Sequence, residues 1–239
     1  MTPAGVARRK IAGSMVWNAI RANAVPMVAL WLLVAAVVAA YGRVPAVAAA
    51  LDALAAWQTA SGWRAAFLNR FVLCGLLPGV FVLSLKALRP PRPLAVVLAQ
   101  ATFAGACGVV SGWMFELHAC WFGAGTDAGT LLVKTAMYQF VWVVAFFMPV
   151  GAVVYFWIGR DFSFRRTRAE WPRHFVRELL VPNLLANWAV WVPLSFLVHL
   201  FPTPLQVQVT GAANAFLGLV LLTLGRRAAT SRSARRTGV

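Results

Sequence analysis

The last third of the chain contains residues 182–227, PNLLANWAVWVPLSFLVHLFPTPLQVQVTGAANAFLGLVLLTLGRR, and this stretch decides the fold. It holds two apolar runs, residues 182–200 and 205–225, which are separated by a proline-containing corner and followed by two arginines. Each run is about 20 residues long, the length that an α-helix needs to cross the hydrocarbon layer of a bilayer. The pattern predicts a helical hairpin within a membrane.

The composition of the whole chain extends this prediction. Of 239 residues, 61% are hydrophobic and only 12% are charged, and the mean hydropathy is +0.75. A soluble domain is typically about a quarter charged. The apolar runs are continuous rather than alternating, which argues against a β-barrel. We therefore expect an all-α fold, a polytopic transmembrane helical bundle.

Six spans are expected in a single transmembrane domain of residues 24–225. They lie near residues 24–41, 65–85, 94–113, 130–158, 182–200 and 205–225. We expect Pro78 to kink the second span and Pro149 to break the fourth, which is too long for one straight crossing.

The segments outside the spans have their own predictions. The basic N-terminal segment, residues 1–23, is expected to lie as an interfacial helix, and the basic tail, residues 226–239, to be disordered. Residues 42–62 are alanine-rich and contain a tryptophan, which suits a short helix at the membrane surface. Residues 114–129 are predicted to form a loop.

The net charge of +16 comes from basic residues that lie between the apolar runs. With both termini on one side, 18 of the 22 lysines and arginines fall on that side of the six-span topology. The positive-inside rule then predicts cytoplasmic termini, and we expect a bacterial inner (plasma) membrane. The expected partners are the bilayer, anionic headgroups on the cytoplasmic side, and further copies or other membrane proteins. We expect no nucleic acid, because the charge is explained by topology.

Neither a cofactor nor a metal site is expected. The three cysteines fall in or near apolar runs and form no Cys-x-x-Cys pair, which is typical of small buried hydrophobic residues. His118, His174 and His199 do not share a span. The chain has no nucleotide-binding or catalytic-triad motif, so we expect no enzyme.

Polar residues inside the spans are the candidates for function, because they are costly there. We predict a polar-lined path for small solutes or ions, formed by Gln100, Gln139, Asn187, His199, Gln208 and Asn214. The alternative is that these side chains join neighbouring helices by hydrogen bonds.

Two cations lie a few residues inside predicted spans. Arg70 and Lys134 are expected near one membrane face, where Glu116 and Asp127 also lie, and together they predict an outer vestibule that could hold an anion. The alternative is that both cations extend to the lipid headgroups.

From residue 101 onward the chain resembles the Mpv-seventeen / twenty-two-kilodalton peroxisomal membrane protein family. The resemblance rests on Gly112-Trp113, Lys134 with Tyr138-Gln139, residues 171–187, and the placement of Trp191, Pro193 and Pro204. The chain departs from the family pattern at Tyr138, where the family has aspartate; at Val192, which separates Trp191 from Pro193; and at Gln208, which replaces an arginine.

The resemblance implies a small helical membrane protein that is channel-like or serves membrane homeostasis, and it implies no enzyme. The family is described with four spans, so the first 60 or so residues have no counterpart in it. We therefore expect a channel-like integral membrane protein.

Two alternatives to this function stay open. The first is a non-catalytic structural or accessory subunit of a larger membrane complex, which glycine-rich and alanine-rich helices and 13% aromatic residues would suit. The second is an enzyme that acts on lipid through Glu116 or His118.

Overall fold

The computed structural model describes residue 21 and residues 24–84 and 89–237. The described chain is helical and contains no strand. Its elements are α2 (Ala24–Tyr41), α3 (Pro45–Ser61), α4 (Trp63–Arg70), η1 (Phe71–Leu76), α5 (Leu77–Ser84), α6 (Pro93–Phe122), α7 (Ala128–Ala136), η3 (Met137–Phe147), α8 (Met148–Ile158), α9 (Phe164–Ala169), η4 (Val176–Leu180), α10 (Val181–Val198) and α11 (Thr203–Thr237). The interfacial helix predicted for residues 1–23 falls almost entirely outside the described residues.

Five helical stretches of the described chain are long and apolar enough to cross a membrane. They are Ala24–Tyr41, Trp63–Ser84, Pro93–Phe122, Ala128–Ile158 and Val181–Val198. Their outward faces carry large apolar side chains, among them Leu32, Val80, Leu94 and Leu132, each at least 60% exposed. The all-helical prediction is confirmed for the described residues, and these apolar faces are compatible with a multi-pass membrane protein. The sixth predicted span falls within α11 and stays a prediction.

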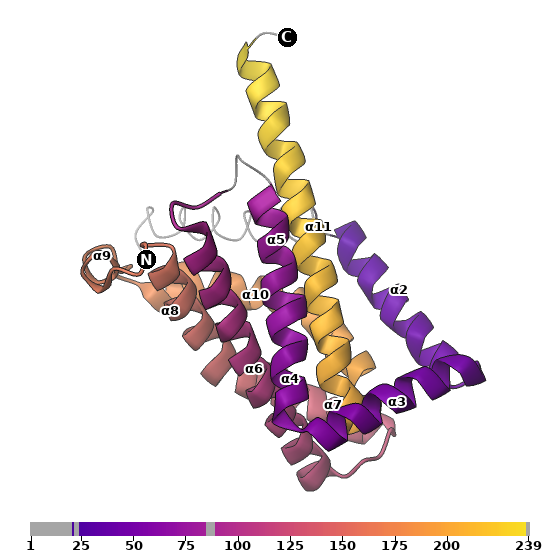
Figure 1. The fold of residues 1–239 in the computed structure, drawn as a ribbon. Helices are drawn as coiled ribbons and strands as arrows, with labels where there is room; N and C mark the ends of the chain where they lie inside the picture. The colour runs from indigo at the N-terminus through magenta and orange to yellow at the C-terminus, as the bar shows by residue number, and fades with distance from the viewer. Residues whose placement is uncertain (1–20, 22–23, 85–88, 238–239) are drawn as a thin grey trace.

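The stretches α4–α5, α6, α7–α8 and α11 run alternately up and down, whereas α3 lies across one end of the molecule (Figure 1). The start of α2, the end of α5, the start of α6, α9 and the C-terminus lie toward one end of the molecule. α3, the turn between α6 and α7, and the start of α11 lie at the other end. Of the described basic segments, the one that contains α9 and the end of α11 lie toward the same end of the molecule. Which side of a membrane this is stays a prediction.

Three boundaries differ from the sequence prediction. α6 continues to Phe122, so Glu116 and His118 lie on a helix and not in a loop. The segment between Gly159 and Leu180 contains α9 and η4. α11 extends to Thr237, so most of the tail predicted to be disordered is helical.

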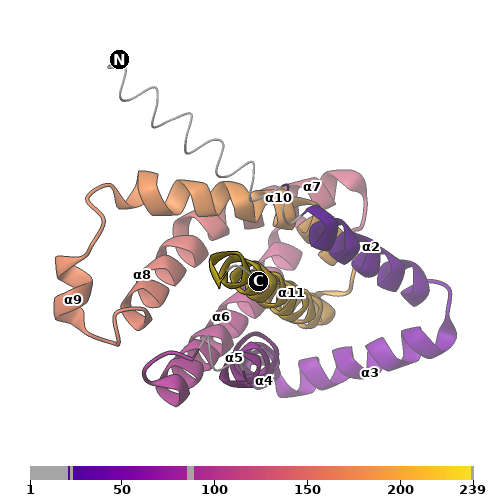
Figure 2. The ribbon, with the colours of Figure 1, turned by 90° about the horizontal axis from the view of Figure 1, so that it is seen from above.

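The predicted hairpin of the last two spans is only partly correct. α10 and α11 are joined by the short corner before Thr203, but they do not pack along their lengths. α10 contacts α2, α7, η3 and η4, whereas α11 contacts α2, α3, α4, η1, α5 and α6. Seen from above, α10 is viewed from the side along one edge of the molecule, while α11 is viewed nearly end-on near the centre (Figure 2). The two helices are therefore neighbours in sequence that do not pack side by side, because each one packs mainly against other helices.

Three prolines follow π-helical turns. Pro78, Pro149 and Pro182 each stand second in an α-helix that directly follows η1, η3 or η4. In each case the residue before the proline donates its N–H to the carbonyl five residues back, at Val72, Val143 and Val176. Proline lacks an N–H and its ring crowds the preceding turn. A wider turn relieves that crowding, so these prolines mark local widening of long helices.

Glycines on η1 and α6 bring two helices into close contact. A Cβ placed on Gly75 would lie 2.1 Å from the Cα of Ala101, and one on Gly108 would lie 2.4 Å from the carbonyl oxygen of Ala66. Gly105 meets the ring of Phe67 at 2.6 Å in the same way. Small residues on α6 therefore allow the close approach at Gly105 and Gly108. We call this contact the glycine seam.

Candidate functional site

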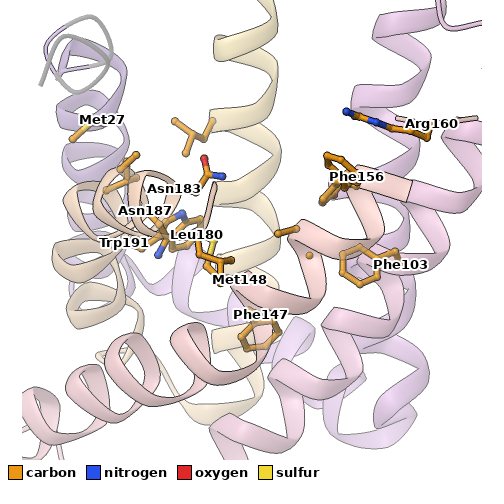
Figure 3. Close-up of a pocket in the computed structure, with 16 residues that line it drawn as sticks. Met27, Phe103, Phe147, Met148, Phe156, Arg160, Leu180, Asn183, Asn187 and Trp191 are labelled. Carbon is orange, nitrogen blue, oxygen red and sulfur yellow. The ribbon is translucent and has the colours of Figure 1, made fainter. Parts of the chain in front are cut away.

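A cavity of about 700 Å³ opens between α10 on one side and α6 and α8 on the other (Figure 3). We call it the outer cavity. Its lining is mainly apolar and aromatic, with the amides of Asn183 and Asn187 on the α10 side. These residues stand four apart and therefore share one helical face. Arg160 lies at its edge, where it stacks 3.8 Å over Phe156 and pairs with Glu170 at 3.0 Å.

A second cavity of about 210 Å³ lies beside the first and deeper in the bundle. We call it the inner cavity. The two cavities share part of their lining: Phe103, Phe147, Met148, Tyr155, Asn187 and Trp191. The inner cavity adds polar side chains from four helical stretches, which are Arg70, Ser111, Tyr138, Gln139 and Asn214. Three residues of the predicted solute path, Gln139, Asn187 and Asn214, therefore line one cavity.

Gln139 is fully buried and joins η3 to α10. Its amide nitrogen donates to the hydroxyl oxygen of Ser195 at 2.6 Å, and its amide oxygen accepts from Asn187 at 3.3 Å. The indole N–H of Trp188 also donates to the Gln139 carbonyl at 3.0 Å. These bonds fix the wall of the inner cavity, so both interpretations apply to Gln139: it lines the cavity and it joins helices.

Arg70 is buried in the inner cavity and does not extend to the membrane surface. Arg70 is 8% exposed, and one of its guanidinium nitrogens, Nη2, donates to the hydroxyl of Thr210 at 2.9 Å. The Nε atom is buried and has no hydrogen-bond partner in the protein. The glycine seam holds the Arg70 side chain in this buried position, because Gly108 lies directly against its Cβ and Cγ atoms.

Other predicted path residues lie elsewhere. Gln208 accepts from Asn69 and donates to Gln58, so it joins α11 to α3 and α4 beside a separate, mainly apolar cavity of about 340 Å³. Gln100 is partly exposed and lines neither the inner nor the outer cavity. Gln208 therefore joins neighbouring helices by hydrogen bonds, as the alternative to a solute path predicted.

His199 belongs to a buried aromatic cluster and not to either cavity. Its ring lies 6.0 Å from that of His118 between centroids, and Phe115 packs edge-on against it. The Nδ1 atom of His199 is 2.6 Å from the Ser195 carbonyl, while Trp142 donates to Nε2 of His118 at 3.0 Å. Sequence reasoning treated these histidines as unrelated. Among the described residues no three metal-binding side chains cluster together.

The four residues of the predicted vestibule are not joined by any hydrogen bond or ion pair that the described structure shows. Arg70 lies in the inner cavity, Lys134 is 3% exposed within α7, and Glu116 is exposed on α6. Asp127 caps α7, where its carboxylate accepts from the Thr130 N–H at 3.0 Å. The side-chain and backbone hydrogen bonds of Thr130 hold the pKa of the Asp127 carboxyl below its ordinary value.

Several residues of the inner cavity were missed as site residues. Ser111 and Tyr138 line it from α6 and η3, and the buried Ser111 hydroxyl makes no geometrically ideal hydrogen bond. Cys74 and Cys107, expected to be plain buried residues, also line it. Ser111 stands three residues after Gly108 on one helical face, which is the signal that could have found it.

No protein-family model, curated protein or solved structure matches this chain. The resemblance described above therefore stays a prediction, and the functional argument rests on the cavities.

Proposed function

We propose that this chain is a channel-like integral membrane protein that passes small solutes or ions through the outer and inner cavities. The observation that carries the proposal is the shared lining of the two cavities. A largely apolar cavity adjoins a smaller one that has more polar side chains in its lining, and Asn187 and Trp191 of α10 line both. Polar groups that line a narrow passage can replace part of the hydration shell of a solute.

Flux through reconstituted liposomes tests this function. Gly151 lines the outer cavity, and a Cβ placed on it would meet no atom within 4 Å. The variant Gly151→Trp should fill this space and lower solute or ion flux at least several-fold while the chain still folds. Gly218→Trp is the matched control, since Gly218 is also helical and free of neighbours but lines neither cavity. Equal flux in wild-type liposomes and empty liposomes would contradict the proposal.

A non-catalytic accessory subunit is the second candidate. Large tryptophans on the outside of the described helices favour it: Trp63, Trp113 and Trp121 are each more than half exposed and offer packing surface to another membrane protein. Purification from native membranes distinguishes the two. A stoichiometric partner, together with absent flux, would favour the subunit.

A further inference from the structure

We propose that the inner cavity binds an anionic group, a carboxylate or a similar oxyanion, with Arg70 as its charge partner. This inference rests on the proposed function, because it names the charge of the solute that the cavities would accept. The anion could belong to a small soluble acid held in the inner cavity alone. It could also be the head of an amphipathic acid whose chain occupies the outer cavity.

The first argument is the absence of a counter-charge. Arginine stays protonated in proteins, so the buried guanidinium of Arg70 is a cation. Among the residues whose side chains the structure describes, which do not include Glu178, none that lines the inner or the outer cavity is acidic. The ion pairs of the described residues involve Arg92 with Asp161 and Arg160 with Glu170, not Arg70. A buried cation without a partner is unfavourable, and an anion would relieve that cost.

The second argument is the supply of unused hydrogen-bonding groups. A guanidinium carries five N–H groups in a planar fork that suits an oxyanion, and Arg70 uses Nη2 on Thr210 while Nε has no partner. The buried Ser111 hydroxyl also makes no geometrically ideal hydrogen bond and lines the same cavity, where the Tyr138 hydroxyl lies near both Ser111 and Arg70. By contrast, the amide nitrogens of Gln139 and Asn187 are already donating to protein groups. The unsatisfied groups therefore belong to Arg70 and Ser111.

The third argument is the match of size and polarity. A cavity of about 210 Å³ has room for a carboxylate or phosphate with a few waters, since water takes about 30 Å³ in the liquid. The adjoining cavity of about 700 Å³ is lined mainly by apolar side chains, as an alkyl chain would require. A smaller cavity that contains an arginine, next to a larger apolar cavity that shares part of its lining, suits an acid of either kind.

Binding to the purified full-length chain in a non-ionic detergent tests the site. Calorimetric titration with sodium acetate, sodium phosphate and sodium decanoate distinguishes a small soluble acid from an amphipathic one. Tighter binding of decanoate than of acetate would show that the outer cavity holds the alkyl chain of the ligand. Arg70→Gln should weaken binding about 30-fold or more, since it removes one partner of a buried charge pair. Arg64→Gln is the matched control, because Arg64 is an exposed arginine on the same helix. No saturable binding, or equal affinity in Arg70→Gln and wild type, would overturn the proposal.

A second measurement keeps the native arginine and so does not depend on the stability of an Arg70 variant. In a chain with Cys74→Ala and Cys120→Ala, Cys107 reports on the inner cavity that it lines. A negatively charged thiosulfonate should then react with Cys107 faster than a positively charged one, and acetate should slow the reaction. Faster reaction of the cationic reagent would overturn the proposal. Solute flux without anion binding would leave the proposed function standing and reject this inference, while binding without flux would do the reverse.

Discussion

Helices α4 and α6 approach so closely at the glycine seam that a single added methyl group would collide with backbone, whereas α8 and α10 stand apart around the outer cavity. Arg70 lies where the two regions meet: the seam holds its aliphatic stem, and the inner cavity receives its guanidinium. Both walls of the outer cavity begin with a widened turn and a proline, Pro149 on α8 and Pro182 on α10. The comparison teaches that α6 is packed tightly against α4 on one side and lines an open cavity opposite α10 on the other.

The largest effect is expected at the seam. In Gly75→Ala the new methyl group would meet the Cα of Ala101 at 2.1 Å, and main chain cannot move aside as a flexible side chain can. We expect the free energy of unfolding in mixed micelles to fall by about 1–3 kcal/mol, the usual cost of overpacking a core. Titration with a denaturing detergent, followed by circular dichroism, measures this change.

Gly151→Ala is the matched control on the other side of the molecule. Gly151 lies on α8, and a Cβ there has no atom within 4 Å. Because alanine is the better helix former, stability should stay equal or rise by up to about 1 kcal/mol. Equal losses in Gly75→Ala and Gly151→Ala would remove the distinction between a tight and an open region.

A smaller effect is expected at the polar contact between η3 and α10. Gln139→Leu removes the hydrogen bonds to Ser195 and Asn187 but leaves the bond from Trp188 to the backbone carbonyl. Since a hydrogen bond between membrane helices contributes well under about 2 kcal/mol, we expect a loss of about 1 kcal/mol. Unfolding of the variant in the same micelles measures it.

Gln100→Leu serves as the control for Gln139→Leu, because Gln100 is partly exposed and lines neither the inner nor the outer cavity. It should leave the free energy of unfolding nearly unchanged. A double-mutant cycle of Gln139→Leu with Ser195→Ala then isolates the contact. A coupling energy of zero would show that the wall of the inner cavity does not depend on this bond.

The helices of this fold could be predicted from the sequence because prolines, glycines and charges mark their ends. The first span was expected at residues 24–41, and α2 has those bounds. The extension of α6 to Phe122 was missed because Glu116 and His118 suggested a loop, although a long helix can carry an exposed acid and a buried histidine on different faces. The widened turns were also missed, since proline predicts a disturbance but not its form.

The site could be predicted in part. Gln139, Asn187 and Asn214 were grouped as polar residues within spans, and the inner cavity contains all three. Arg70 was expected a few residues inside the second span, near one membrane face, because depth was counted along the helix, and that count does not say which face of the helix points inward. His118 and His199 are 81 residues apart, so their contact depends on how α6 and α10 cross, which no local pattern records.

The smallest effect is expected where α7 begins, at the start of the long helix that forms one wall of the outer cavity. The hydrogen bonds from Thr130 lower the pKa of the Asp127 carboxyl below its value in the unfolded chain, which is about 4. The contribution of this cap to the stability of the fold is therefore fully present above about pH 4. As pH falls through the lowered pKa, the carboxylate is protonated and the contribution is lost. Wild-type stability should therefore decline more steeply than that of Asp127→Asn between about pH 4 and pH 2, because asparagine caps a helix without titrating. Unfolding curves at stepped pH measure the difference, and parallel declines would show that the cap does not stabilise this wall.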